Sequence, residues 1–357
     1  MHKITKRSLL VVLFLFLFAG IASAAPKYKW SFAQPWPRPV ADKGYQFFCD
    51  KVKEYTNGDI EIKLYSNGLL GTHDESLHGV RDGSIEIATL SPYVNLVPGG
   101  MMNWMPWTVS TFDEARVAYA YPDGVLFKVM EVAWQEVGVQ MLFSCSQGAY
   151  GLANNVRPLR TPDDLKNLKM RVSSSMASVM CLGNMGSGTG MTMETIPWAE
   201  IYNALSRKVV DGCWDMWPSL VDERHVEVLK YYTHGLLNWD ANNVVINKKL
   251  WDSLDPKYKE AIFKAGAEAE QYLNDLYEAE EKKYIEKLEK DYPNFEITWL
   301  TPEETAVWRE KANMPAIWKE LCDPWLEKHW PGQNMGEKIQ ADLAAIRDKV
   351  AAEKAGK

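Results

Sequence analysis

The sequence lacks the residue patterns that many hydrolases, metalloenzymes and nucleotide-binding proteins need. Its six histidines are scattered, and they form neither a His-Glu-x-x-His motif nor a cysteine–histidine spacing suited to zinc. No Gly-x-Ser-x-Gly segment is present to place a nucleophilic serine on a strand-to-helix turn. The glycine-rich stretch 186–190 is not followed by Gly-Lys-Ser/Thr, so we interpret it as a loop without a nucleotide. These absences favour binding over catalysis.

The chain also lacks a basic block, an internal repeat and a low-complexity linker. It carries 40 Lys and Arg against 47 Asp and Glu, for a net charge of −7. An acidic chain of this kind is a poor candidate for nucleic acids or anionic membrane surfaces. No long apolar run follows residue 24, so we expect a mature protein that is not inserted in a membrane.

The first residues have the order of a secretory signal. A basic segment, Lys3 to Arg7, precedes the apolar run 9–18, and small residues occupy 22–24. This order predicts a cleaved signal peptide at 1–24 and a periplasmic protein. The apolar run is shorter than the roughly 20 residues that span a bilayer, and no cysteine follows the cleavage site to carry a lipid.

The composition is that of a globular chain with an unusual number of tryptophans. The 357 residues are 46% hydrophobic, which suffices for two domains with large cores. The five cysteines are odd in number and widely spaced, so we expect mostly buried thiols and leave disulfide pairing open. The 15 tryptophans exceed what a core alone requires, and several remain for a ligand pocket.

Hydrophobic periodicity predicts an α/β protein with mostly parallel sheets. The chain begins with a β-α-β-α-β order over 28–90, and a second α/β region starts at the helix signal Thr161-Pro162-Asp163-Asp164. A strand at 244–247 is expected to return to the first sheet, and 255–290 is expected to be one long helix. Crossing strands without a linker predict two lobes with a cleft between them.

We assign the lobes from this pattern. Lobe I is predicted to contain 25–150 and a segment of about 240–285. Lobe II is predicted to contain 151–239 and a segment of about 286–357.

Four stretches, in this order, resemble the solute-binding proteins of tripartite ATP-independent periplasmic (TRAP) transporters. They are 48–88, which includes Val-x-Glu-x-Thr-Asn-Gly at 52–58, then 161–172, 196–212 and 245–254. The resemblance covers nearly the whole mature chain. It implies a two-lobed periplasmic binding protein that closes over a small organic acid and serves a membrane permease.

The resemblance implies that Arg171 clamps the carboxylate of the ligand. This arginine ends the Leu-Lys-x-Arg segment that the family places at its ligand site. A guanidinium offers a planar pair of donors that matches a carboxylate, and a closed cleft shields that pair from water. The alternative is a structural arginine paired with an acidic side chain of the protein itself.

The sequence departs from the family after Asp211-Gly212. The family usually has Glu-Asn or Glu-Trp there, whereas this chain has Trp214-Asp215. Tryptophan cannot ligate a metal, so we predict no cofactor and keep Asp215 as the one candidate for a bound cation. A carboxylate repels a ligand carboxylate, so a zwitterion would satisfy Arg171 and Asp215 together.

Aromatic residues supply the remaining candidates for the cleft. Tyr150 aligns with a position at which the family contacts its ligand. An aromatic box could hold an aromatic acid or, by cation–π attraction, a cationic group. Its candidate members are Trp36, Trp107, Trp214, Trp217 and Trp239. The alternative is that at least half of these tryptophans belong to the core.

These observations predict a receptor that captures a carboxylate-containing solute by hinge closure. The solute is expected to be aromatic, apolar or zwitterionic, and the partners are the subunits of a TRAP permease. One alternative is a sensor subunit that presents its ligand to a membrane kinase. Another is a periplasmic enzyme on the same scaffold, which would need a nucleophile or an acid–base pair in the cleft.

Overall fold

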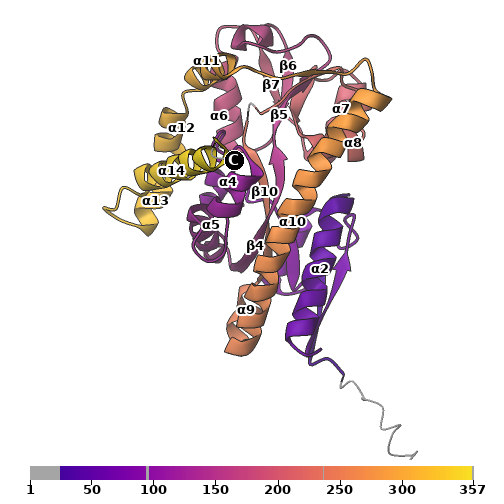
Figure 1. Cartoon of the computed structure of the whole chain (residues 1–357), viewed down its shortest axis with the longest axis vertical. Helices are drawn as coiled ribbons and strands as arrows, with labels where there is room; N and C mark the ends of the chain where they lie inside the picture. Colours follow the sequence, from indigo (N-terminus) through magenta and orange to yellow (C-terminus); the bar gives the residue numbers. More distant parts are fainter. Residues whose placement is uncertain (1–24, 94–95, 236, 356–357) are drawn as a thin grey trace, which may run out of the picture.

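The structure is a computed structural model that describes residues 25–93, 96–235 and 237–355. The predicted signal peptide, 1–24, lies outside these residues. Two sheets form two lobes that lie one above the other along the longest axis of the molecule (Figure 1).

The sheet of the first lobe has five strands in the order β2-β1-β3-β10-β4. β1 is parallel to β2 and β3, whereas β10 is antiparallel to β3 and β4. The strands are β1 (Tyr28–Ala33), β2 (Ile60–Tyr65), β3 (Ile87–Leu90), β4 (Val139–Ala149) and β10 (Trp239–Asn247). Every residue of β4 and β10 is buried, although both strands carry several polar side chains.

The sheet of the second lobe has six strands in the order β11-β9-β5-β8-β6-β7. β6 is parallel to β7 and β8, and β5 is antiparallel to β8 and β9. The strands are β5 (Gly151–Asn154), β6 (Lys169–Val172), β7 (Thr192–Thr195), β8 (Gly212–Asp215), β9 (Tyr231–Thr233) and β11 (Glu296–Thr298).

Helices cover both sheets and connect the lobes. The helices before residue 200 are α2 (Pro39–Tyr55), α3 (His73–Asp82), α4 (Phe112–Ala118), α5 (Val125–Glu136) and α6 (Met176–Met185). Those after it are α7 (Ile201–Ser206), α8 (Trp217–Asp222), α9 (Lys248–Ser253), α10 (Pro256–Asp291), α11 (Pro302–Ala312), α12 (Met314–Leu321), α13 (Asp323–His329) and α14 (Met335–Ala355). Short 3-10 helices are η1 (Pro98–Trp104), η2 (Pro162–Leu165), η3 (Trp198–Glu200) and η4 (His225–Glu227).

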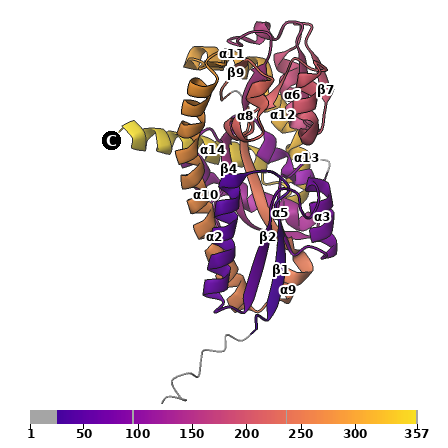
Figure 2. The same cartoon turned by 90° about the vertical axis from the view of Figure 1, so that its right-hand side faces the viewer.

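Two crossing segments and one long helix join the lobes. The chain passes from β4 to β5 at Tyr150 and returns to β10 at 237–238. The Tyr150 amide donates to the Asn238 carbonyl at 2.9 Å, and the Leu237 amide donates to the Tyr150 carbonyl at 3.2 Å. Helix α10 has 36 residues, which is about 54 Å of length, and it runs beside both lobes (Figures 1 and 2). These connections form the hinge region.

The predicted fold class is confirmed, including the opening β-α-β-α-β order and the return of β10 to the first sheet. The long helix expected over 255–290 is α10. The lobe boundaries stay a prediction. Of the segment 286–357, which was placed in lobe II, β11 joins the second sheet, whereas α13 and α14 contact η1, α4 and α5 of the first lobe.

Candidate functional site

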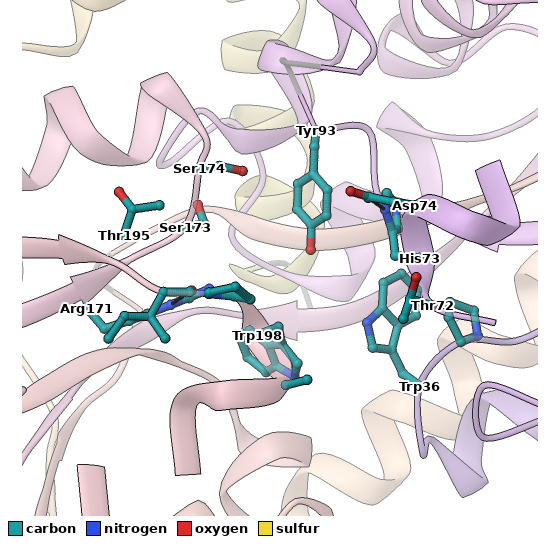
Figure 3. A pocket seen from close by; sticks show the side chains of 14 residues that line it. Trp36, Thr72, His73, Asp74, Tyr93, Arg171, Ser173, Ser174, Thr195 and Trp198 are labelled. Carbon is teal, nitrogen blue, oxygen red and sulfur yellow. Dashed lines mark hydrogen bonds and ion pairs between the residues drawn. The ribbon is translucent and has the colours of Figure 1, made fainter. Parts of the chain in front are cut away.

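A cavity of about 490 Å³ lies between the two lobes. The first lobe contributes Pro35, Trp36, Thr72, His73, Asp74 and Tyr93. The second lobe contributes Arg171, Ser173, Ser174, Thr195, Ile196, Pro197, Trp198 and Ala199. Figure 3 shows Arg171 and Trp198 on one side of this space and Trp36, His73 and Asp74 on the other. A cavity between lobes of this size suits a small molecule.

Arg171 is the only buried cation that lines this cavity among the described residues. Strand β6 carries it between β7 and β8, and the residue is 4% exposed. Its Nε donates to the Ile196 carbonyl at 2.8 Å, and no acidic side chain of the described residues forms an ion pair with it. Burial lowers the pKa of Arg171, since desolvation disfavours the charged form. A carboxylate in the cavity would offset that cost.

Trp198 forms the wall next to Arg171 and connects it to a second arginine. The Arg171 guanidinium lies 5.5 Å from the centre of the indole ring, and the Arg38 guanidinium lies 5.8 Å from it. Both distances are those of cation–π contacts. The indole Nε1 also donates to Glu223 Oε2 at 2.6 Å. One side chain therefore touches both the cavity and a charged group behind it.

Arg38 and Glu223 form an ion pair across the two lobes. Arg38 precedes α2 in the first lobe, and Glu223 follows α8 in the second. The Arg38 Nη2 to Glu223 Oε1 distance is 2.7 Å, and the two side chains are 5% and 12% exposed. Arg38 also donates to Ser219 Oγ at 3.2 Å. These contacts hold the lobes together at the inner end of the cleft.

The first-lobe wall begins with the N-terminus of α3. Thr72 and Glu75 form a capping box, which fixes the start of this helix at the cavity. His73 follows at once, with its Nδ1 2.8 Å from Asp74 Oδ1 and its Nε2 2.9 Å from the Ser91 carbonyl. The ring of Tyr93 lies 4.6 Å from that of His73. The wall therefore combines the start of a capped helix with two adjacent aromatic rings.

A smaller inner chamber adjoins the cavity, with which it shares Trp36, Tyr93 and Trp198. Its lining is completed by Arg38, Ser91, Trp104, Tyr150, Asp240 and Asn242. Asp240 is 3% exposed. Burial raises the pKa of Asp240 to about 7, and nearby Arg38 opposes that rise. The inner end of the cleft thus combines aromatic rings with a carboxyl group that titrates near neutral pH.

Of the residues predicted for the site, three line this space. Arg171 and Trp36 line the main cavity, and Trp36 and Tyr150 line the inner chamber. The Tyr150 ring lies 6.4 Å from Trp104 and 6.3 Å from Trp198. The structure therefore brings these three residues together from two different lobes and from the crossing segment between them.

Asp215 lies in a buried hydrogen-bond network behind the cavity wall. Its Oδ1 accepts the Met216 amide at 2.8 Å, and its Oδ2 accepts His225 Nδ1 at 2.9 Å. Burial alone would lower the pKa of His225, but the Asp215 carboxylate outweighs it and raises that pKa. No group of three or more His, Cys, Asp or Glu side chains suited to a metal occurs within the described ranges. A cation at Asp215 stays a prediction.

The other predicted tryptophans occupy different surroundings. Trp214 lies opposite Leu152 in the second sheet, and Trp239 packs edge-on against Phe112 at 4.8 Å. Trp217 donates its Nε1 to Glu281 of α10 at 2.9 Å. Trp107 lines a separate groove beside α11, α12 and α14. None of the four lines the cavity or the inner chamber in the part of the chain that is described.

Sequence reasoning missed Trp198, Tyr93, Arg38 and Asp240. Trp198 stands in the segment 196–205 that carried the resemblance, so its place in that motif was a usable signal. Asp240 directly follows Trp239, but nothing local distinguished it from other acids. Arg38 meets Ser219 across 181 positions of sequence, and no local pattern predicts that contact.

Two lobes, a cavity between them and a buried guanidinium without an acidic partner among the described residues are the features of a solute-binding receptor. No helix within the described ranges is long and apolar enough to cross a membrane. Residues 37–322 match the family model described as bacterial extracellular solute-binding protein, family 7. The chain belongs to this family, whose members serve TRAP transporters, and the predicted function class is confirmed.

Individual relatives agree with this assignment. The chain is 28% identical over 288 residues to the C4-dicarboxylate-binding periplasmic protein DctP of Rhodobacter capsulatus, covering 77% of this chain and 80% of that protein. It is 22% identical over 332 residues to the ectoine/5-hydroxyectoine-binding periplasmic protein UehA of Ruegeria pomeroyi, covering 92% and 94%. A TRAP periplasmic solute-binding protein from Ochrobactrum anthropi superposes with a TM-score of 0.77 at 24% identity, covering 91% of this chain and 97% of that one.

Proposed function

We propose that this receptor captures a small zwitterion with one carboxylate and one cationic group, and delivers it to a TRAP permease without chemical turnover. The observation that carries the proposal is the buried Arg171 guanidinium, which faces a cavity and has no acidic partner among the described residues. An arginine in that position offers two parallel hydrogen bonds to a carboxylate. The carboxylate end of the solute therefore lies against β6.

The inner end of the cleft supports a cationic group at the other end of the solute. Tyr93, Trp104 and Tyr150 present aromatic rings there, and such rings attract cations through their faces. Asp240 lies among them, while the charge of Arg38 is matched by Glu223. A cationic group beside Asp240 favours the ionised form of its carboxyl group. The aromatic rings and the Asp240 carboxylate would then both attract the cationic end of the solute.

A polyhydroxylated acid fits this lining less well. The walls combine two prolines, aromatic rings and the aliphatic side chains of Ile196 and Ala199 with a limited set of hydroxyl groups, which belong to Thr72, Tyr93, Ser173, Ser174 and Thr195. A solute with many hydroxyl groups would leave several of them without partners, and each buried unpaired polar group costs about 1–3 kcal/mol. Two relatives are named for ectoine, a carboxylate-containing zwitterion, which supports the same solute class.

Hinge closure links binding of the solute to its delivery, because the solute stabilises the closed conformation. Arg171 and Trp198 come from the second lobe, whereas Trp36, Tyr93 and Asp240 come from the first. A solute that contacts both sets binds the closed form better than the open form, so it shifts the population toward closure. The closed receptor is the form that we expect the permease to recognise.

The solute class is tested by thermal-shift measurements with matched compounds. The panel contains ectoine, glycine betaine and proline as zwitterions, succinate and glucuronate as polar acids, and benzoate as an aromatic acid. Binding to the folded state alone raises the melting temperature. We expect the largest rise with a zwitterion. A larger rise of the melting temperature with glucuronate or succinate would contradict the proposal of a zwitterionic solute. Mass spectrometry of each compound after incubation with the protein would reveal any chemical turnover.

A further inference from the structure

A second groove, separate from the cleft, lies where the C-terminal helices meet the first lobe. Its volume is about 250 Å³. It is lined by Pro106, Trp107, Thr108, Arg309, Met314, Pro315, Trp318, Gln340, Leu343 and Arg347. None of these residues lines the cleft cavity or its inner chamber in the described part of the chain.

Two arginines face this groove without acidic partners. Neither Arg309 nor Arg347 takes part in an ion pair with any described residue. Desolvation is the largest cause of the lowered pKa of Arg309, the positive charge of Arg347 lowers that pKa further, and the carboxylate of Glu114 partly opposes both effects. Two like charges that share a groove repel each other, and a bound anion would relieve that repulsion.

The groove also holds polar donors that lack acceptors. The Nε of Arg347 and the indole Nε1 of Trp107 are buried, and neither has a hydrogen-bond partner. Buried donors in folded proteins usually have an acceptor, so an occupant with acceptor atoms would satisfy these two. Trp107 is 8% exposed, so its indole cannot turn to bulk water. Both residues line the groove.

The position of Trp107 is held by the same arginines. Its backbone has a φ of 59°, a left-handed conformation that is strained for a bulky residue. Arg347 Nη2 donates to the Trp107 carbonyl at 3.0 Å, and the Arg309 guanidinium lies 5.4 Å from the centre of the indole ring. Trp107 is therefore a wall of the groove as well as a buried residue of the core.

The groove joins elements from both lobes. Arg309, on α11, and Trp318, on α12, belong to helices that contact α6 of the second lobe. Arg347 lies on α14, which contacts α4 and α5 of the first lobe. Figure 1 shows α11, α12 and α14 together along one side of the molecule. An occupant that touches both arginines therefore connects the lobes away from the cleft.

We propose that this groove is a second ligand site, which binds a small carboxylate with an apolar body and bridges Arg309 and Arg347. The carboxylate supplies the negative charge and the acceptors that the two arginines and the Trp107 indole lack. The apolar body lies against Met314, Trp318 and Leu343. The inference does not rest on the identity of the solute in the cleft.

Calorimetry with benzoate tests the site in the Arg171→Ala background, which removes the carboxylate clamp of the cleft. We expect binding of one benzoate per chain, at least tenfold weaker binding after adding Arg309→Gln, and no measurable binding after adding Arg309→Gln and Arg347→Gln together. Arg309 is exposed, so its substitution leaves the fold intact. Arg207→Gln, at an exposed arginine after α7, is the matched control and should not change the affinity.

Three results would overturn the inference. They are no benzoate binding to Arg171→Ala, unchanged affinity in Arg309→Gln, or equally tight binding of inorganic sulfate, which has no apolar body. Loss of cleft binding by the panel zwitterions would leave this result unaffected. Failure of the second site and failure of the proposed solute class are therefore distinguishable.

Discussion

Replacing Arg38 by methionine should weaken solute binding by opening the lobes, because Arg38, at the inner chamber, pairs with Glu223 of the second lobe. The substitution removes the guanidinium and retains most of the apolar stem. Glu223 would then be buried in the closed form without a counter-ion, since its side chain is only 12% exposed. In the open form the same carboxylate would reach water. The cost therefore falls on closure rather than on folding.

The size of the effect follows from burial of the pair. Removing one partner of a buried ion pair costs about 3–5 kcal/mol. Trp198 still donates a hydrogen bond to Glu223 in the variant, which offsets part of the cost of losing Arg38. We therefore expect a net cost of about 3 kcal/mol. That energy corresponds to roughly 100-fold weaker affinity. The double variant Arg38→Met with Glu223→Gln removes both charges of the pair and should recover affinity to within about tenfold of the wild type.

Calorimetry measures the affinity, and small-angle scattering measures closure by the fall in radius of gyration on adding solute. Arg160→Met is the matched control, because its ion pair with Glu304 is half exposed, with the Arg160 side chain 55% accessible. An exposed pair contributes about 0–1 kcal/mol. Wild-type affinity in Arg38→Met, or a double variant that binds worse than either single variant, would refute this reasoning.

Two further predictions concern buried carboxyl groups. Burial raises the pKa of Glu270 to about 8, so folding favours its neutral form and wild-type stability falls as pH rises from about 4.5 to 8. In Glu270→Gln, the decrease in the free energy of unfolding between pH 5 and pH 9 should be smaller by roughly 2–4 kcal/mol. Urea unfolding at the two pH values measures it, and a pH dependence equal to that of the wild type would contradict the prediction. Burial also raises the pKa of Asp240 to about 7, so affinity for a zwitterion should increase from pH 6 to 8. Asp240→Asn should bind more weakly at pH 8 and lose this dependence, and calorimetry that shows the same pH profile in both proteins would argue against contact with Asp240.

Local patterns in the sequence predicted most of the architecture. Glu and Lys pairs four residues apart supported the prediction of one long helix over 255–290, and the observed α10 is Pro256–Asp291. The alternation at 28–32 and 60–64 predicted two strands that pair in parallel as β1 and β2. Helices and strands of this kind bury one face against a neighbouring element, so the spacing of their apolar residues predicts which face is buried. The contacts of α13 and α14 with the first lobe could not be predicted in this way, because they depend on tertiary packing alone.

The site was predictable only where a motif or an unusual residue type marked it. Arg171 was found through its motif, and Trp36 and Tyr150 were found among several aromatic candidates. Trp214 and Trp239 were equally plausible by composition, but the sheet register directs them away from the cavity. Asp240 and Arg38 could not be identified from the sequence, because their roles depend on contacts between elements that are far apart along the chain. The acid sought at Asp215 is instead engaged by His225.

The central claim is that Arg171 holds the carboxylate of the solute. The most direct measurement is the affinity of Arg171→Gln, by calorimetry, for the compound that gives the largest thermal shift in the wild type. Loss of a charge-assisted, doubly bonded contact in a shielded site costs about 3 kcal/mol, so the account predicts roughly 100-fold weaker binding with unchanged unfolding of the ligand-free protein. Wild-type affinity in Arg171→Gln would contradict the account.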